Sequence, residues 1–286
     1  MMISFMNIRF TSTTRSRLAF LALACLTAVL PAHAEHEGKL QILLVGDSST
    51  EGSMPRLMRP QGPHLEDVVR ILLAAEKDLP PTNVINLGLS GEYVRRLLDT
   101  GRYEREIAKK PGVDYIFIRY GLNDYARREN FTENYPKDYS ELIARLRKDH
   151  PAATLIVMTV IPYMDAEKSA QINALNRQVA RDEKLPLFDI YPRYAQELRK
   201  GENMLNYRRY ALSKVPEQYH ELVKSFVFGK APKQDVMVMD NQLDAQLGKL
   251  PGWFGDRHPN LAGYHVIGDE TARYLAKMIR EKGGKK

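Results

Sequence analysis

The sequence is poor in the residues and motifs that define disulfide-stabilised proteins, metalloproteins and nucleotide-binding proteins. Its one cysteine, Cys25, lies in an apolar N-terminal segment that we expect to be removed, so the mature chain would contain no disulfide. The histidines and acidic residues do not show the His-Glu-x-x-His spacing of a zinc site. Gly88-Leu89-Ser90-Gly91 lacks the lysine and the spacing of a phosphate-binding loop. We therefore expect a fold held together by its hydrophobic core, with no metal site.

A strong excess of charge of one sign is also lacking. The formal charge is +7 over 286 residues, and removal of the three N-terminal arginines would lower it from +7 to +4. The other basic residues, such as Arg95-Arg96, Arg127-Arg128 and Arg208-Arg209, are scattered among acidic ones. This scatter is typical of a solvated surface, so we expect no nucleic-acid partner.

The N-terminus has the three parts of a secretory signal peptide. Three arginines precede the apolar segment Leu18–Leu30, which is too short to span a bilayer comfortably. Ala32-His33-Ala34 then provides a cleavage site of the Ala-x-Ala type. We predict a signal peptide over residues 1–34, cleavage after Ala34, and export to the periplasm or the exterior without a membrane anchor. An uncleaved N-terminal anchor is the alternative.

We predict a single domain at residues 35–286, in which short apolar runs alternate with segments whose apolar residues have helical spacing. We expect strands at residues 40–45, 83–87, 114–120, 154–160 and 187–190. We expect helices at residues 64–77, 92–110, 136–150, 166–184 and 261–282, and a polar loop at residues 125–135. This alternation predicts βαβ units and therefore a three-layer α/β/α sandwich around a five-stranded parallel sheet.

Residues 191–252 depart from the alternation, and we interpret them as an insertion. They contain short helical stretches, such as residues 193–199 and 217–228, and a Lys/Pro/Gln-rich loop near residues 230–235. An insertion near the strand ends is a candidate lid or substrate wall. A purely structural appendage on the sandwich is an equally open interpretation.

Four loops carry the side chains needed for acyl transfer, namely Gly46-Asp47-Ser48, Gly88–Gly91, Gly121–Asp124 and Asp256–Pro259. The first three follow strand ends, which share one edge of a parallel sheet. A serine attacks a carbonyl group when a histidine removes its proton and a carboxylate orients that histidine. The resulting oxyanion needs hydrogen-bond donors. The backbone N–H groups of Ser48 and Gly91 and the side-chain amide of Asn123 are candidates.

These blocks resemble the SGNH hydrolase superfamily, also called GDSL-type esterases and lipases. Its blocks occur here in the family's order: Gly-Asp-Ser with Ser48, Asn86 to Gly91, Gly-x-Asn-Asp with Asn123, and a last block with His258. The resemblance covers roughly residues 39–190 and 253–280. It implies a flavodoxin-like sandwich and ester hydrolysis without a cofactor. It also implies that Ser48 is the nucleophile, that His258 is the base, and that Ser48, Gly91 and Asn123 form the oxyanion hole.

The last block departs from the family's Asp-x-x-His spacing. Gly255 stands three residues before His258, and the acid, Asp256, stands two residues before it. A carboxylate two residues away reaches the imidazole if the segment turns, so we predict Asp256 as the triad acid. Asp240 and Asp244 are the alternatives, and a Ser–His dyad without an acid is a further one.

Three other charged residues stand beside these blocks. We expect Asp47 to cap the turn after the first strand, and Asp124 to hold its own loop. Arg119 ends an apolar strand, and a buried charge needs a partner. We therefore expect it to pair with Asp124 or Asp47, the alternative being that it faces the substrate.

The function predicted from the sequence is that of an exported serine esterase. Its expected substrate is a small-molecule or polysaccharide acyl ester, with O-acetyl groups on carbohydrate preferred because of the predicted export and the family resemblance. Acyl transfer to a sugar hydroxyl instead of water would make it an O-acetyltransferase. A non-catalytic carbohydrate-binding or assembly protein is the alternative from a different class. No exposed apolar lid is evident in residues 191–252, which disfavours a lipase.

Overall fold

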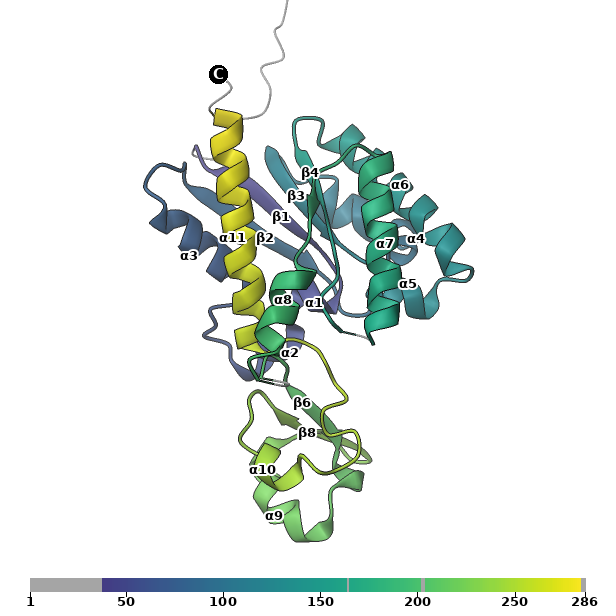
Figure 1. Ribbon diagram of the computed structural model, residues 1–286, viewed down its shortest axis with the longest axis vertical. Coiled ribbons are helices and arrows are strands. Elements are labelled where there is room, and N and C mark those ends of the chain that lie inside the picture. The colour runs from purple at the N-terminus through teal and green to yellow at the C-terminus, as the bar shows by residue number, and fades with distance from the viewer. Residues whose placement is uncertain (1–37, 164, 202–203, 284–286) are drawn as a thin grey trace, which may run out of the picture. The chain divides into compact units, whose positions relative to one another are not determined.

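The structure, a computed structural model, describes residues 38–163, 165–201 and 204–283 (Figure 1). The predicted signal peptide, with Cys25 and the cleavage site after Ala34, lies outside these residues. Within the described part of the chain, no helix has the length and apolar character needed to cross a membrane.

The central sheet is parallel, and its strand order is β2-β1-β3-β4-β5. The strands are β1 (Leu40–Gly46), β2 (Thr82–Gly88), β3 (Val113–Arg119), β4 (Thr154–Met158) and β5 (Leu187–Phe188). This order is that of flavodoxin-like folds, in which the chain reverses direction across the sheet between β1 and β3. The predicted five-stranded parallel sheet is confirmed.

Helices cover both faces of the sheet, which makes three layers (Figure 1). One face carries α3 (Leu65–Ala75), α8 (Tyr191–Leu198) and α11 (Leu261–Gly283). The other face carries α4 (Val94–Asp99), a π-helical turn (Tyr103–Ile107), α5 (Leu122–Arg127), α6 (Phe131–Asp149) and α7 (Ala166–Asp182). The predicted sandwich is therefore confirmed.

The first strand is apolar along its length because both of its faces are buried. Ile42 and Leu44 pack in the cluster beneath α3 and α11, whereas Leu43 and Val45 pack in the opposite cluster. Each of these four side chains is at most 3% exposed. Alternate residues of a strand point to opposite faces, so a central strand with helices on both sides needs an unbroken apolar run. This burial fixes the position of the residues that follow β1.

The prediction of a polar loop at residues 125–135 is wrong. Helix α5 extends to Arg127, and α6 begins at Phe131 instead of at Pro136. Phe131 and Tyr135 are buried and stack with their ring centroids 5.0 Å apart. This packing outweighs the backbone hydrogen bond that Pro136 cannot donate within the helix.

The chain after α8 forms a second, antiparallel sheet with the order β6-β8-β7. Its elements are β6 (Arg208–Ala211), β7 (Val227–Lys230), β8 (Lys233–Val238), α9 (His220–Val223), α10 (Asp244–Leu247) and short 3-10 turns at Leu212–Lys214, Glu217–Tyr219 and Lys224–Phe226. Strands β7 and β8 replace the end of the helical stretch predicted at 217–228 and the loop predicted at 230–235. The predicted insertion at about 191–252 also includes α8, whose Tyr194 is buried in the sandwich core.

Candidate active site

The turn after β1 places Ser48 at the start of the short helix α1 (Ser48–Glu51). A Cβ atom on Gly46 would lie 2.3 Å from Oγ1 of Thr50 and 2.6 Å from the carbonyl oxygen of Arg119, so only glycine fits there. Asp47 caps the helix, as the sequence predicts, by accepting the backbone N–H of Ser49 at 2.8 Å. The strand, the glycine and the cap together fix the position of Ser48 at the carboxyl edge of the sheet.

Ser48, His258 and Asp256 lie in a hydrogen-bonded row. Oγ of Ser48 is 3.0 Å from Nε2 of His258. Nδ1 of His258 is 2.6 Å from Oδ1 of Asp256, which also accepts the backbone N–H of His258 at 3.0 Å. The two-residue spacing suffices because an aspartate side chain can accept the backbone N–H two residues further on, and the same oxygen, Oδ1, then also lies within hydrogen-bond distance of Nδ1 of His258. With the proton on Nδ1, Nε2 is free to accept the proton of Ser48.

Asp256 is also bound from the second sheet. Nε of Arg209, on β6, lies 3.2 Å from Oδ2 of Asp256. Burial raises the pKa of Asp256, but the hydrogen bonds from His258 and the charge of Arg209 outweigh it, so the net pKa lies below its usual value. The carboxylate is therefore ionised at neutral pH and able to stabilise a positive charge on His258.

Two tyrosines position the imidazole of His258. The ring of Tyr207 is parallel to the imidazole, with 5.7 Å between centroids, and its backbone N–H donates to the carbonyl oxygen of His258 at 3.2 Å. Tyr163 approaches nearly perpendicular to the imidazole, with its hydroxyl oxygen 3.0 Å from Nδ1 and 3.2 Å from Nε2. Arg209 donates a hydrogen bond to the hydroxyl of Tyr207 at 2.7 Å. These three residues could not be identified from the sequence, because Tyr163 and Tyr207 lie outside the helices and strands, Arg209 lies on the short strand β6, and none belongs to a motif.

Three predicted oxyanion donors lie at the same cavity. Among the described residues, no acceptor takes the backbone N–H of Ser48 or of Gly91. Gly91 has φ of +75°, a conformation that glycine adopts without strain. Nδ2 of Asn123 donates one of its two protons to the carbonyl oxygen of Glu92 at 3.0 Å, which leaves the other proton for a ligand.

A buried ion pair fixes the loop that carries Gly91. Oε2 of Glu92 accepts from Arg102 at 2.6 Å and from the hydroxyl of Tyr120 at 2.7 Å. Arg102 also donates to the carbonyl oxygen of Leu87 at 2.7 Å. Glu92 thus anchors the Gly91 loop through its side chain and Asn123 through its backbone. Glu92 was not singled out from the sequence, although its position directly after the predicted donor Gly91 could have indicated a role in fixing that loop.

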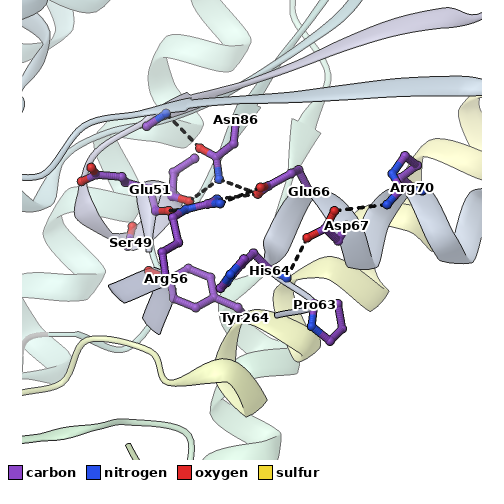
Figure 2. A network of polar contacts seen from close by, with 12 residues as sticks. Ser49, Glu51, Arg56, Pro63, His64, Glu66, Asp67, Arg70, Asn86 and Tyr264 are labelled. Carbon is purple, nitrogen blue, oxygen red and sulfur yellow. Dashed lines mark hydrogen bonds and ion pairs between the residues drawn. The ribbon is translucent and has the colours of Figure 1, made fainter. Parts of the chain in front are cut away.

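A second polar network, drawn in Figure 2, supports the backbone after Ser48. Arg56, on α2 (Ser53–Met58), donates to both carboxylate oxygens of Glu66, at 2.7 and 2.6 Å. Nδ2 of Asn86 donates to Glu66 at 3.1 Å and to the carbonyl oxygen of Thr50 at 2.8 Å. Nε of Arg56 donates to the carbonyl oxygen of Glu51 at 2.8 Å. Asn86 of the second block therefore helps to fix helix α1.

The other charged residues singled out from the sequence have structural contacts. Asp124 accepts the backbone N–H groups of Val94 at 2.8 Å and Gly121 at 3.0 Å, and burial raises its pKa to about 7. The expected ion pair of Arg119 with Asp47 or Asp124 is wrong, because no such pair occurs within the described residues. Arg119 instead donates to the carbonyl oxygen of Ser49 and to Oγ1 of Thr50, both on α1.

The two alternative acids belong to other contacts. Asp244 forms an ion pair with Arg208 and accepts the indole N–H of Trp253 at 2.7 Å, which places it in the core around the second sheet. Asp240 accepts the backbone N–H of Gln242 at 3.0 Å. Asp256 is therefore the carboxylate that contacts His258.

His258 and the three donor residues, Ser48, Gly91 and Asn123, line a cavity of about 360 Å³. The lining residues are Ser48, Gly52, Ser53, Met54, Pro55, Ser90, Gly91, Leu122, Asn123, Ala126, Arg127, Tyr163, Tyr207, Arg209, His258 and Tyr264. Tyr264, on α11, also donates to the carbonyl oxygen of Ser48 at 2.8 Å. A volume of this size is at the lower end of the range for small-molecule sites.

Comparison with known proteins shows the family of this chain. The model of the GDSL-like Lipase/Acylhydrolase family matches residues 44–266, and the chain belongs to that family. It is therefore an enzyme of the GDSL-type serine esterase class, which acts on acyl esters. A comparison with curated protein sequences gives no match.

Solved structures share the fold at low sequence identity. One is LAE5, an alpha/beta hydrolase enzyme from the metagenome of Lake Arreo, Spain, which is 21% identical, with a TM-score of 0.52. Another is Axe2, an acetylxylan esterase from Geobacillus stearothermophilus, which is 19% identical, with a TM-score of 0.51. Each alignment covers 82% of this chain and 94% of the other chain. At this identity the likeness concerns the fold, which is that of SGNH hydrolases.

Proposed function

We propose that this enzyme is an exported serine esterase that removes small acyl groups, above all O-acetyl groups, from carbohydrate through an acyl-enzyme at Ser48. The observation that carries the proposal is the hydrogen-bonded row of Ser48, His258 and Asp256. Ser48, at one end of this row, lines a cavity that also contains the three hydrogen-bond donors. These are the groups that acyl transfer requires.

Acylation begins with attack of Oγ of Ser48 on the carbonyl carbon of the ester, while Nε2 of His258 accepts the hydroxyl proton. The carbonyl oxygen becomes an oxyanion, which the N–H groups of Ser48 and Gly91 and the amide of Asn123 stabilise. The positive charge on His258 is stabilised by Asp256 at 2.6 Å. His258 then gives the proton to the ester oxygen, the bond to the alcohol breaks, and the acyl group remains on Ser48.

Deacylation repeats these steps with water. His258 accepts a proton from water, the hydroxide adds to the acyl carbon, and collapse of the second oxyanion returns the proton to Oγ of Ser48. The carboxylic acid is released and the free enzyme is regenerated. A sugar hydroxyl in place of water would yield acyl transfer, so hydrolysis and transfer differ only in the acceptor.

A small acyl group and a polar alcohol suit the cavity. Its volume of about 360 Å³ leaves little room for a long acyl chain together with the alcohol. Ser53 and Ser90 lie at its edge with their hydroxyl oxygens 3.1 Å apart, and both are suited to hydrogen bonding with sugar hydroxyls. Axe2, which shares the fold, is an acetylxylan esterase. The signal-peptide pattern of residues 1–34 supports a substrate outside the cytoplasm.

Hydrolysis of para-nitrophenyl acetate, butyrate and octanoate by the mature protein tests the proposal. We expect the highest kcat/KM for acetate, and no activity above the uncatalysed rate in Ser48→Ala. An octanoate preference would overturn the assignment to small acyl groups. Ester hydrolysis that persists in Ser48→Ala would overturn the acyl-enzyme mechanism.

Two further measurements separate the alternatives. With an acetylated xylooligosaccharide, hydrolysis releases one acetate for each acetyl group lost, whereas transfer to an added sugar releases less acetate than acetyl lost. Absence of Ser48-dependent turnover on every ester would instead favour a carbohydrate-binding protein. N-terminal sequencing of the protein from cell fractions tests the export, for which we expect an exported chain that begins at Glu35.

A further inference from the structure

Two arginines converge on the loop that carries the oxyanion donor Gly91. Nη1 of Arg96, on α4, lies 3.3 Å from the carbonyl oxygen of Gly91, and Nη1 of Arg127, at the end of α5, donates to the same oxygen. A Cβ atom on Gly91 would meet both guanidinium groups, at 3.3 Å from Arg127 and 3.7 Å from Arg96. Both side chains are exposed, and Arg127 lines the cavity that contains Ser48.

No acid neutralises these two arginines. Within residues 38–163, 165–201 and 204–283, neither guanidinium forms an ion pair, and their other N–H groups have no acceptor. Two acids of the neighbouring segments, Glu51 and Glu92, have other hydrogen-bond partners, although the charge of Arg96 also acts to lower the pKa of Glu92. Oε2 of Glu51 accepts the backbone N–H of Ser90 at 2.6 Å, and Glu92 is bound to Arg102. Two cations that share one carbonyl oxygen repel each other, and an anion bound between them would relieve that repulsion.

The lining of the cavity is also positively charged. Its lining includes Arg127 and Arg209 and, among the described residues, no aspartate or glutamate. Arg209 is neutralised by Asp256, so Arg127 remains as the cationic group that faces a ligand. The free N–H groups of a guanidinium match a carboxylate in geometry and charge.

We propose that Arg96 and Arg127 form a carboxylate subsite, and that the esterified carbohydrate is therefore acidic, with a uronic-acid residue next to or at the acetylated position. This inference rests on the proposed function, since it names the substrate class of the same cavity. The carboxylate binds the guanidinium groups beside Gly91, while the acetyl carbonyl lies at Ser48. Binding energy from the carboxylate then orients the reacting ester.

Acetylated galacturonate oligomers test the subsite, with the methyl esters of the same oligomers as a neutral control of equal acetylation. We expect wild-type kcat/KM to favour the acid form by about tenfold or more, since hydrogen bonds to charged groups have this magnitude. Arg127→Gln removes the charge and should abolish the preference, whereas Arg127→Lys retains the charge and should keep most of it. Added salt should raise KM for the acid form more than for the methyl ester. Arg96→Gln is the second variant if Arg127→Gln does not fold.

The outcomes separate this inference from the function on which it rests. Equal activity on acid and methyl ester, with para-nitrophenyl acetate still hydrolysed, would overturn the carboxylate subsite and leave the esterase. If no ester is hydrolysed, the subsite is tested by isothermal titration calorimetry, which measures the binding of trigalacturonate to the Ser48→Ala variant. Binding that is lost in Ser48→Ala/Arg127→Gln supports the subsite, and absence of binding to Ser48→Ala refutes it.

Discussion

The role of Asp256 yields the sharpest prediction, because its spacing from His258 departs from the family pattern. Oδ1 of Asp256 is the acceptor for Nδ1 of His258, at 2.6 Å, and the side chain is only 12% exposed. At this distance, with an effective dielectric constant of about 20, a carboxylate and the imidazolium of the transition state attract by about 6 kcal/mol. Each factor of ten in rate corresponds to about 1.4 kcal/mol. Asp256→Ala should therefore lower kcat for para-nitrophenyl acetate by about 10⁴-fold.

Asp240→Ala is the matched control. It removes the same carboxylate from an aspartate that accepts its hydrogen bonds from Gln242. Its kcat should stay within about twofold of wild type, as for a surface substitution. Circular dichroism and thermal unfolding of both variants show whether the fold is retained. A folded Asp256→Ala variant within tenfold of wild type would refute the triad and would favour a Ser48–His258 dyad.

Three further predictions concern the groups around the triad. Arg209→Gln should lower kcat/KM by only about two- to fivefold, because the side chain of Arg209 is 40% exposed and an exposed ion pair contributes little. Arg209→Lys should recover most of the loss. A change beyond a hundredfold would contradict this secondary role. Asn123→Ala should lower kcat by about 10²–10³ with little change in KM, and an unchanged kcat would exclude it from the oxyanion hole. Burial raises the pKa of Glu66, but its bonds to Arg56 and Asn86 outweigh this and hold the pKa below its usual value. Arg56→Met should thus destabilise the fold by about 2 kcal/mol at neutral pH in denaturant titrations. The difference should shrink as pH falls through the lowered pKa of Glu66, because protonation removes the same ion pair; a difference independent of pH would contradict that assignment.

The sandwich could be predicted because its signals are local. A central strand such as Leu40–Gly46 must be apolar at successive positions, and the turn after it must contain Gly46, whose Cβ would clash with Thr50. The helix of residues 261–283 has its capping residue, Asn260, directly before it, and Oδ1 of Asn260 accepts the N–H of Gly263 at 3.0 Å. These features depend on residues close in sequence, so the pattern reveals them.

The groups around His258 could not be predicted, because they depend on long-range packing. Tyr163 lies 95 residues from His258 along the chain. Arg209 lies on β6, and Tyr207 directly precedes that strand, which belongs to a sheet that was not predicted from the sequence. The strands of that sheet are four to six residues long, and its residues 227–230 are largely exposed, so they show no clear alternation. The early start of α6 was missed for a related reason, since the stacking of Phe131 on Tyr135 outweighs the local signal of Pro136.

Covalent labelling of Ser48 tests the central claim most directly. Diethyl para-nitrophenyl phosphate phosphorylates an activated serine and releases one para-nitrophenol, which is measured together with the mass of the labelled peptide. The account predicts one label per chain, on the peptide that contains Ser48, loss of esterase activity in proportion to labelling, and no label in Ser48→Ala. Full inactivation with the label on a different residue, or undiminished ester hydrolysis in Ser48→Ala, would contradict it.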